Sequence, residues 1–368
     1  MIAQLLLWTL LISGTIYAGF IVYLHSGMSQ LDPPAPSRNL RFTVLVVAHN
    51  EAEQIAACVE SLLGQDYPEN LLEIILIDDR SADGTGDIMK RYGEQFDHIR
   101  VLHIAKTPPA FSPKKYALTQ GIAAATGEWI LTTDADCQPP STWLSKTASY
   151  VSPGTEMIIG PAPLQPNGTF ISKMSALDAL AADSIAAGTA GWNMAIQSTG
   201  RNFGYQKQLL QEIDGYQGIE QILSGDDTLL LQKARRQAKC RAVYIADPDV
   251  AVPSPAPELF MDRVHQRRRH VSGSLYFPRR VKTGYFLFYL SNSVLWIGCG
   301  IALFSPLPVL LPLTLLMIKF LLDFSLLRRS AHHSKQHALL KWFLPWELFY
   351  FLEQITISPL GLLGKTRW

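Results

Sequence analysis

Three short acidic clusters in the middle of the chain carry the residue types needed to bind a cation and to move a proton. They contain Asp78 with Asp79, Asp134 with Asp136, and Asp226 with Asp227. Two carboxylates separated by one residue can converge on a single hard cation, because Mg²⁺ takes one or two carboxylates and completes its shell with waters and substrate phosphates. A further carboxylate in the same site can act as a general base toward an attacking hydroxyl group.

Each cluster also has a structural explanation. Ser81 and Asp83 can cap the helix that follows them. The stretch Asp134-Ala135-Asp136 can be a solvated acidic turn, and Asp227 can be the N-cap of the helical stretch Thr228–Ala234. A carboxylate near metal-bound phosphates has a pKa set by competing effects. The spacing alone leaves capping and catalysis open.

The segments around these clusters alternate between strand-like and helical patterns. Phe42–Ala48 is an apolar, β-branched run typical of a buried parallel strand. The helical stretch Glu51–Leu63, the strand Glu73–Ile77, the helix Lys114–Thr126 and the strand Glu128–Thr132 follow it. This order predicts a doubly wound sheet. Ligands bind beyond the carboxyl ends of strands in such sheets, which is where the acidic clusters fall.

Both ends of the chain are apolar. The uncharged stretch Ile2–Leu24 is long enough to cross a bilayer. A cleaved signal peptide is the competing interpretation, but it would need a basic start and a shorter apolar core. Gly284–Phe304 and Pro306–Leu327 predict a transmembrane hairpin joined at Ser305-Pro306. The stretch Leu339–Leu363 contains two glutamates, and it is predicted to be interfacial, re-entrant or transmembrane.

Composition limits the remaining classes of protein. The chain has 368 residues, a hydrophobic fraction of 48% and a formal net charge of +1. A near-neutral chain is not expected to bind nucleic acid or another polyanion. Its four cysteines include no C-x-x-C pair, which excludes a disulfide framework or a cysteine zinc site and fits a reduced compartment.

Cations flank the apolar segments and predict their orientation. They are Arg38, Arg41, Arg279, Arg280, Lys282, Arg328, Arg329 and Lys335. All of them lie on one side of the membrane if the N-terminus is outside, and the positive-inside rule makes that side the cytoplasm. We therefore expect a multi-pass protein of the cell (inner) membrane with its catalytic domain in the cytoplasm.

A basic run, His265 to His270, precedes the predicted hairpin. Such a run commonly contacts lipid headgroups or determines topology. A planar guanidinium also matches phosphate oxygens, so one arginine of the run can bind a diphosphate. The run is long enough for both roles.

Taken together, these residues resemble the membrane-bound family 2 glycosyltransferases of GT-A fold, the branch that includes cellulose, chitin and hyaluronan synthases and ceramide glucosyltransferase. The resemblance covers about Thr43 to His270. Ala48-His49-Asn50-Glu51 is similar to the opening P-x-x-N-E motif, and Lys114 with Ala117, Leu118 and Gly121 is similar to the G-K-x-x-A-L-x-x-G helix, with Pro113 in place of the usual glycine.

The resemblance implies a role for each matching residue. The donor nucleotide would be bound by Ala48, Asn50, Glu51, Asp79, Lys114 and Asp134, and the metal by Asp134 and Asp136. Asp227, with Asp226 beside it, would be the catalytic base. Gly200 and Asn202, with Tyr205, resemble the G-x-N-x-x-Y strip that faces the acceptor. Gln266 and Arg269 match the first and fourth positions of Q-x-x-R-W and would bind the diphosphate.

One position departs from the family pattern. The final tryptophan of Q-x-x-R-W is His270 here, on the acceptor side. Imidazole offers less stacking surface than indole and adds a titratable edge. This departure favours a single transfer over long-chain synthesis.

The resemblance implies an inverting, metal-dependent transfer from a nucleotide-diphosphate sugar, with UDP expected as the nucleotide, to a lipid or glycan acceptor. The metal would be Mg²⁺ or Mn²⁺. Alternatives are a short-chain polysaccharide synthase, a nucleotidyltransferase that binds nucleoside diphosphates, and a non-catalytic scaffold, which would be expected to lose an acidic cluster.

The predicted division of the chain has seven parts. They are a transmembrane helix (1–26), a proline-rich linker (27–40), a cytoplasmic GT-A domain (41–255), an interfacial segment with Q-x-x-R (256–283), a transmembrane hairpin (284–327), a basic cytoplasmic loop (328–338) and a final interfacial, re-entrant or transmembrane segment (339–368).

Overall fold

The computed structural model describes residues 2–36, 38–304 and 308–362. The predicted turn at Ser305-Pro306 and the last six residues of the chain lie outside the described residues. The strands are β1 (Phe42–Ala48), β2 (Leu72–Asp79), β3 (Ile99–Ile104), β4 (Trp129–Asp134), β5 (Thr155–Ile159), β6 (Leu164–Gln165), β7 (Phe203–Gln206), β8 (Arg241–Tyr244) and β9 (Ser254–Pro255).

The α-helices are α1 (Ile2–Met28), α2 (Ile55–Leu63), α3 (Thr85–Gln95), α4 (Pro113–Ala124), α5 (Trp143–Tyr150), α6 (Phe170–Gly191), α7 (Lys207–Glu212), α8 (Thr228–Gln237), α9 (Phe260–Ser274), α10 (Arg279–Leu303), α11 (Leu310–His333), α12 (Phe343–Thr356) and α13 (Ser358–Leu362). Short 3₁₀ turns are η1 (Glu69–Leu71), η2 (Gly200–Asn202), η3 (Pro248–Val250) and η4 (His337–Trp342).

Seven strands form one mostly parallel sheet in the order β3-β2-β1-β4-β7-β5-β8. Strands β3, β2, β1 and β4 run parallel, while β7 is antiparallel to both of its neighbours. In register, Ala48 lies opposite Asp78 and Val47 lies opposite Asp134. The ends of β1, β2 and β4 therefore reach the same edge of the sheet.

Each face of the sheet is covered by helices, as the unbroken apolar strands require. On one face, Ile55, Val59 and Leu62 of α2 pack with Met89 of α3 and Trp143 of α5. The other face is covered by α4, α6 and α8, and its core continues into α1 through buried residues such as Leu24 and Met28. The sheet domain and the N-terminal helix thus share one apolar core.

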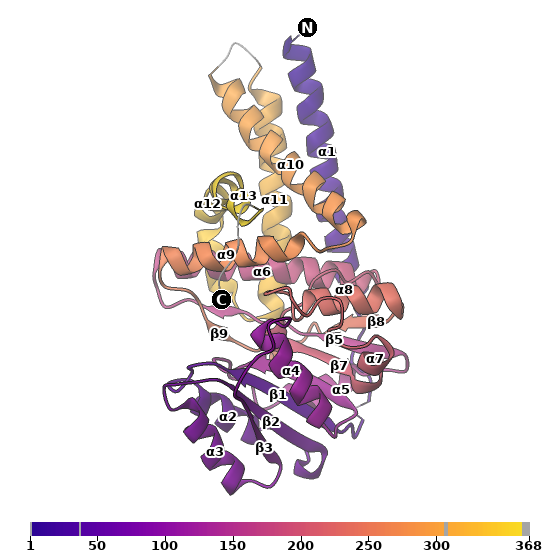
Figure 1. The fold of residues 1–368 in the computed structure, drawn as a ribbon. Helices are drawn as coiled ribbons and strands as arrows, with labels where there is room; N and C mark the ends of the chain where they lie inside the picture. Colours follow the sequence, from indigo (N-terminus) through magenta and orange to yellow (C-terminus); the bar gives the residue numbers. More distant parts are fainter. Residues whose placement is uncertain (1, 37, 305–307, 363–368) are drawn as a thin grey trace.

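Helices α1, α10 and α11 project together from one side of the sheet domain, and α9 and α6 cross beneath them (Figure 1). Within the described residues, these three helices are the ones long and apolar enough to cross a membrane. Together with the sheet, they confirm the predicted fold class of a Rossmann-like domain carrying N- and C-terminal apolar helices.

Helix α1 is fixed to α6 by a close approach of backbones. A Cβ atom at Gly27 would lie 1.9 Å from the carbonyl oxygen of Gly188, and one at Gly191 would lie 1.8 Å from that of Gly27. Only glycine fits at these positions. The Nε1–H of Trp192 donates to the carbonyl oxygen of Tyr23 at 2.9 Å and ties the end of α6 to α1.

Two predicted boundaries near the apolar helices are wrong. Helix α10 begins at Arg279, so the cations expected before the helix lie in its first turn. Helix α11 continues to His333, which makes the first half of the predicted loop 328–338 helical. The apolar pattern marks only the part of a helix that faces apolar surroundings, whereas the backbone hydrogen bonds extend into the polar flanks.

The final predicted segment contains η4, α12 and α13, none of which is a candidate membrane span among the described residues. Its two acids point inward. Glu347 pairs with the buried ammonium of Lys319 on α11, and Glu353 pairs with Arg263 on α9. Charge neutralisation inside the molecule explains how an apolar helix accommodates both glutamates.

Candidate active site

The loops that follow β1 and β2 are joined by hydrogen bonds. The Asn50 side-chain oxygen accepts from the Ala82 N–H at 2.8 Å, and the Glu51 N–H donates to Thr85 Oγ1 at 2.8 Å. Asn50 has a positive φ of 58°, a conformation that asparagine tolerates better than most residues. These bonds hold the Asn50-Glu51 turn beside the Asp78-Asp79 strand end.

Asp79 and Asp83 have partners within their own loop. The Asp79 carboxylate accepts from Arg80 Nε at 2.8 Å and Nη2 at 3.1 Å, a two-point pair. Asp83 accepts from the Thr85 N–H at 3.0 Å and from the Thr85 hydroxyl, although the N-cap of α3 is Gly84 and not Asp83. Asp79 is buried. To bind the nucleobase of a donor, its carboxylate would have to release Arg80 or accept from both groups at once.

A lysine joins the second and third acidic clusters. Lys114 Nζ lies 2.7 Å from Asp134 Oδ1 and 3.2 Å from Asp226 Oδ2. Desolvation acts to raise the pKa of Asp134, but the charge and hydrogen bond of Lys114 outweigh it, and the pKa is lowered. Carboxylates 92 positions apart in the chain are therefore held on one ammonium group.

Asp227 lies directly beside this group and has two backbone donors. Its carboxylate accepts from the Gly200 N–H at 2.8 Å and from the Thr228 N–H, so Asp227 is also the N-cap of α8. Burial and the adjacent Asp226 charge raise the pKa of Asp227 to about 6, although both N–H donors and Lys114 act in the opposite direction. A carboxylate with this pKa is largely ionised at neutral pH and remains basic enough to accept a proton.

Glu51, Asp134 and Asp136 form a region of excess negative charge. Burial and the neighbouring Asp134 raise the pKa of Asp136, and burial together with Asp136 and Asp134 raises the pKa of Glu51. Among the described residues, no three or more Asp, Glu, His or Cys side chains form a complete metal cage. Two carboxylates that repel each other fit a Mg²⁺ or Mn²⁺ ion whose other ligands are waters and phosphates.

The first and last residues of the Gly200–Asn202 turn have different surroundings. Gly200 faces the acids, because a Cβ there would lie 3.1 Å from Asp226 Oδ2. Asn202 is buried. Its Oδ1 accepts from Trp143 Nε1, and its Nδ2 donates to the carbonyl oxygens of Pro161 and Val250, each at 2.9 Å. The expectation that the Asn202 side chain faces an acceptor is therefore wrong: it fixes the turn from inside.

Arg201 is a site residue that the sequence analysis did not identify. Its Nη1 donates to Ser254 Oγ at 2.5 Å, and its charge acts to lower the pKa values of Asp134 and Asp136. The only signal in the sequence was its place at the variable position between Gly200 and Asn202. Because that position carries no residue preference in the motif, the arginine was not distinguished from other surface cations.

Helix α9 brings the basic run to the same region. Ser224 Oγ donates to the Arg269 carbonyl oxygen at 3.2 Å, and the Arg269 charge acts to lower the pKa of Asp134. Gln266 is half-buried and His270 is exposed on the same helix. The structure thus brings Arg269 near the acidic groups at Asp134 and Asp226.

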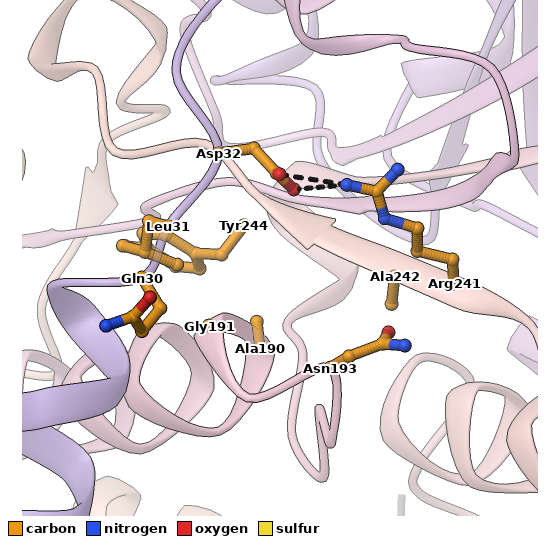
Figure 2. Close-up of a pocket in the computed structure, with 9 residues that line it drawn as sticks. All are labelled: Gln30, Leu31, Asp32, Ala190, Gly191, Asn193, Arg241, Ala242 and Tyr244. Carbon is orange, nitrogen blue, oxygen red and sulfur yellow. Dashed lines mark hydrogen bonds and ion pairs between the residues drawn. The ribbon is translucent and has the colours of Figure 1, made fainter.

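Water reaches some of these side chains. Protein atoms surround Asp134 and Lys114, yet 33% and 21% of their side-chain surfaces remain accessible. A separate hollow of about 120 Å³ lies at the edge strand β8, where Asp32 of the linker pairs with Arg241 at 2.8 Å (Figure 2). That hollow is lined by none of the acidic residues described above.

The family model and the curated relatives that this chain resembles are all glycosyltransferases. The model for glycosyl transferase family 2 matches residues 43–216. The chain is 38% identical to the probable glycosyltransferase YdaM of Bacillus subtilis over 99 residues, which is 27% of this chain and 23% of that protein. It is 34% identical to the beta-monoglucosyldiacylglycerol synthase of Trichormus variabilis over 102 residues, 28% of this chain and 21% of that protein.

A solved structure matches over nearly the whole chain. The mannosyltransferase PcManGT from Pyrobaculum calidifontis, in complex with GDP-Man and Mn²⁺, superposes with a TM-score of 0.61. The match covers 94% of this chain and 99% of that one at 18% sequence identity, so it concerns the fold. The curated relatives are matched over a smaller share, about a quarter of their own length for YdaM and the Trichormus synthase.

Proposed function

We propose that this chain, whose residues 43–216 match the model for glycosyl transferase family 2, moves a sugar from a nucleotide-diphosphate donor to a hydroxyl group of a membrane lipid or glycan. The observation that carries the proposal is the convergence of Asp134, Asp226 and Asp227 around Lys114. This arrangement supports a catalytic base next to a cation site.

The chemistry follows from the side chains in place. Asp227 takes the proton from the acceptor hydroxyl, and its two backbone donors keep the carboxylate oriented. Lys114 and Arg269 provide positive charge where the diphosphate departs. A divalent ion held by Asp134 and Asp136 would neutralise the same leaving group. A single in-line displacement of this kind inverts the anomeric carbon.

A lipid acceptor is supported by two features. Helices α1, α10 and α11 start or end beside the domain that carries the acids (Figure 1), and one relative is named for synthesis of a glucosylated diacylglycerol. The exposed His270 in place of an aromatic floor favours one transfer over chain growth. We infer a cytoplasmic domain from the positive-inside pattern.

The test is release of nucleoside diphosphate from UDP- or GDP-sugars by purified membranes, with lipid extract as acceptor and mass spectrometry of the product. We expect release that stops in EDTA, and a loss of roughly 100-fold or more in Asp227→Asn with donor binding retained. Asp87→Asn, an exposed carboxylate on α3, is the matched control. A product linked through a pyrophosphate would instead identify a nucleotidyltransferase.

A further inference from the structure

The segment between α7 and α8 ends in Asp226 and Asp227, and a buried lysine holds it. The Nζ atom of Lys115 donates to the carbonyl oxygens of Ile219 at 2.9 Å, Ile222 at 2.6 Å and Ser224 at 3.0 Å. The Lys115 residue is 1% exposed. An ammonium group has three donors, and all three are used here on one segment.

The adjacent Lys114 holds the same segment from a second direction. Its Nζ lies 3.2 Å from the carboxylate of Asp226, two residues beyond Ser224. Consecutive residues of a helix point about 100° apart, which explains why one lysine reaches the carboxylates and the next reaches the carbonyl oxygens. The first turn of α4 therefore contacts the segment at its main chain and at its acidic side chain.

Helix α9 meets the segment at the same residue. Ser224 Oγ donates to the carbonyl oxygen of Arg269 at 3.2 Å. A Cβ atom at Gly273 would come within 2.5 Å of Ser224 Oγ, so glycine is needed for the contact. Ser224 is thus the point where the segment that ends in Asp227 touches both α4 and the helix that carries Arg269.

We propose that Lys115 is a positioning residue that sets the Asp226-Asp227 pair at its correct distance from the Arg269 helix. The inference rests on the function proposed above for Asp227. An apolar side chain at position 115 would leave three partly buried carbonyl oxygens without their shared donor, and the segment would have to move for them to find other partners. Any such movement is transmitted to Asp226, only two residues from the Ser224 carbonyl.

The chain provides a matched control in Lys233 on α8. Its Nζ also donates to carbonyl oxygens of the same segment, those of Gly215 at 2.8 Å and Gln217 at 2.7 Å. Lys233 is 6% exposed. The two lysines share their chemistry and burial, but the carbonyl groups held by Lys233 are distant from Asp226 in sequence. They are linked to Asp226 through the Tyr216 hydroxyl, which donates to the Asp226 carbonyl oxygen at 3.0 Å.

The experiment compares Lys115→Met with Lys233→Met in detergent-purified full-length protein. We expect Lys115→Met to lower kcat by about 100-fold with the donor KM within about threefold, since a 1 Å displacement of a catalytic group costs this much. Lys233→Met should keep kcat within about threefold while losing a comparable amount of thermal stability. Equal losses of kcat in both variants, or an unchanged kcat in Lys115→Met, would overturn the inference.

Amide hydrogen exchange gives a second readout that does not depend on activity. Lys115→Met should speed exchange at 219–227 and in α9, whereas Lys233→Met should affect only 213–218. If Lys115→Met does not fold, Ser224→Ala removes the hydrogen bond to Arg269 and should speed exchange in α9 alone. Unchanged exchange in α9 overturns the positioning role. Absence of any transfer by the wild type overturns the proposed function, and the exchange pattern still decides the role of Lys115.

Discussion

Charge is distributed unevenly among the carboxylates of the site. Lys114 pairs with Asp134 and Asp226, whereas the pKa values of Asp136 and Glu51 are raised by burial and by the neighbouring acids. A free enzyme with this arrangement tolerates local repulsion that a divalent ion would relieve. Residues that look alike in the sequence, an aspartate at each end of Asp134-Ala135-Asp136, therefore have different electrostatic environments.

The raised pKa of Asp227 predicts a pH dependence. Its value of about 6 in the free protein means that the base is protonated at lower pH. We expect kcat/KM, which reports on the free enzyme, to fall about tenfold for each pH unit below 6 and to level off above it. The measurement is initial transfer rate between pH 4.5 and 8 in buffers of constant ionic strength. A profile that stays level down to pH 4.5 would exclude Asp227 as the base.

The acidic residues could be placed from the sequence because parallel strands end at a common edge. Asp78, Asp79 and Asp134 follow from that rule, and β1 was predicted at its observed bounds. The rule says nothing about side-chain direction. The inward turn of Asn202 and the reach of Lys115 to carbonyl groups more than 100 positions away depend on tertiary packing, which no local pattern records.

At the scale of elements, α9 divides its arginines between two faces. Arg263 is buried with Glu353 and Asp178, and Arg267 lies 3.5 Å from Asp178, whereas Arg269 is on the side of the acidic cluster. From the sequence, lipid headgroups and a diphosphate were the expected partners of the basic run, and these internal acids were not expected. The pairing across 90 positions of chain could not be deduced from spacing.

Loss of the Arg263 charge should therefore affect both stability and activity. Arg263→Met leaves Glu353 and Asp178 without their shared cation, and breaking a buried pair costs about 3–5 kcal/mol. We expect a large fall in Tm in detergent and a fall in transfer rate, because α9 also carries Arg269. Lys90→Met, which removes an exposed pair with Glu94, is the control and should change Tm little. Equal Tm values for both variants would contradict the role assigned to Arg263.

The contact between α1 and α6 leads to a prediction about packing. Gly27→Ala introduces a Cβ that would lie 1.9 Å from a backbone oxygen of α6, so the helices must separate. Overpacking of this kind costs about 1–3 kcal/mol. Gly19→Ala on the same helix has no atom within 4 Å of the new Cβ and should be neutral or slightly stabilising. Thermal unfolding of the two variants in one detergent tests the difference, and similar Tm values would show that the close approach is not required.

Considered as a whole molecule, the chain places flanking cations at the domain end of its apolar helices. Arg329, near the end of α11, donates to the carbonyl oxygens of Met28 and His25 at 2.7 Å and 3.1 Å. Arg279 lies in the first turn of α10. Two of the cations predicted from sequence to share one side of the membrane, Arg279 and Arg329, therefore lie at the same end of these helices. Helix α12, with 14 residues, is about 21 Å long and is too short to cross a hydrocarbon core of about 30 Å.

This arrangement predicts the orientation of the protein in the membrane. All four native cysteines are buried, so a single introduced cysteine can report accessibility. Phe304→Cys lies at the end of α10 away from the domain, at a residue that is 93% exposed, and Lys90→Cys lies on the domain, where the side chain is 73% exposed. In intact cells a membrane-impermeant maleimide should label Phe304→Cys and should not label Lys90→Cys, because the positive-inside rule puts the domain in the cytoplasm. Lysis should make Lys90→Cys reactive, which controls for its intrinsic accessibility, and the reverse labelling pattern would place the catalytic domain outside.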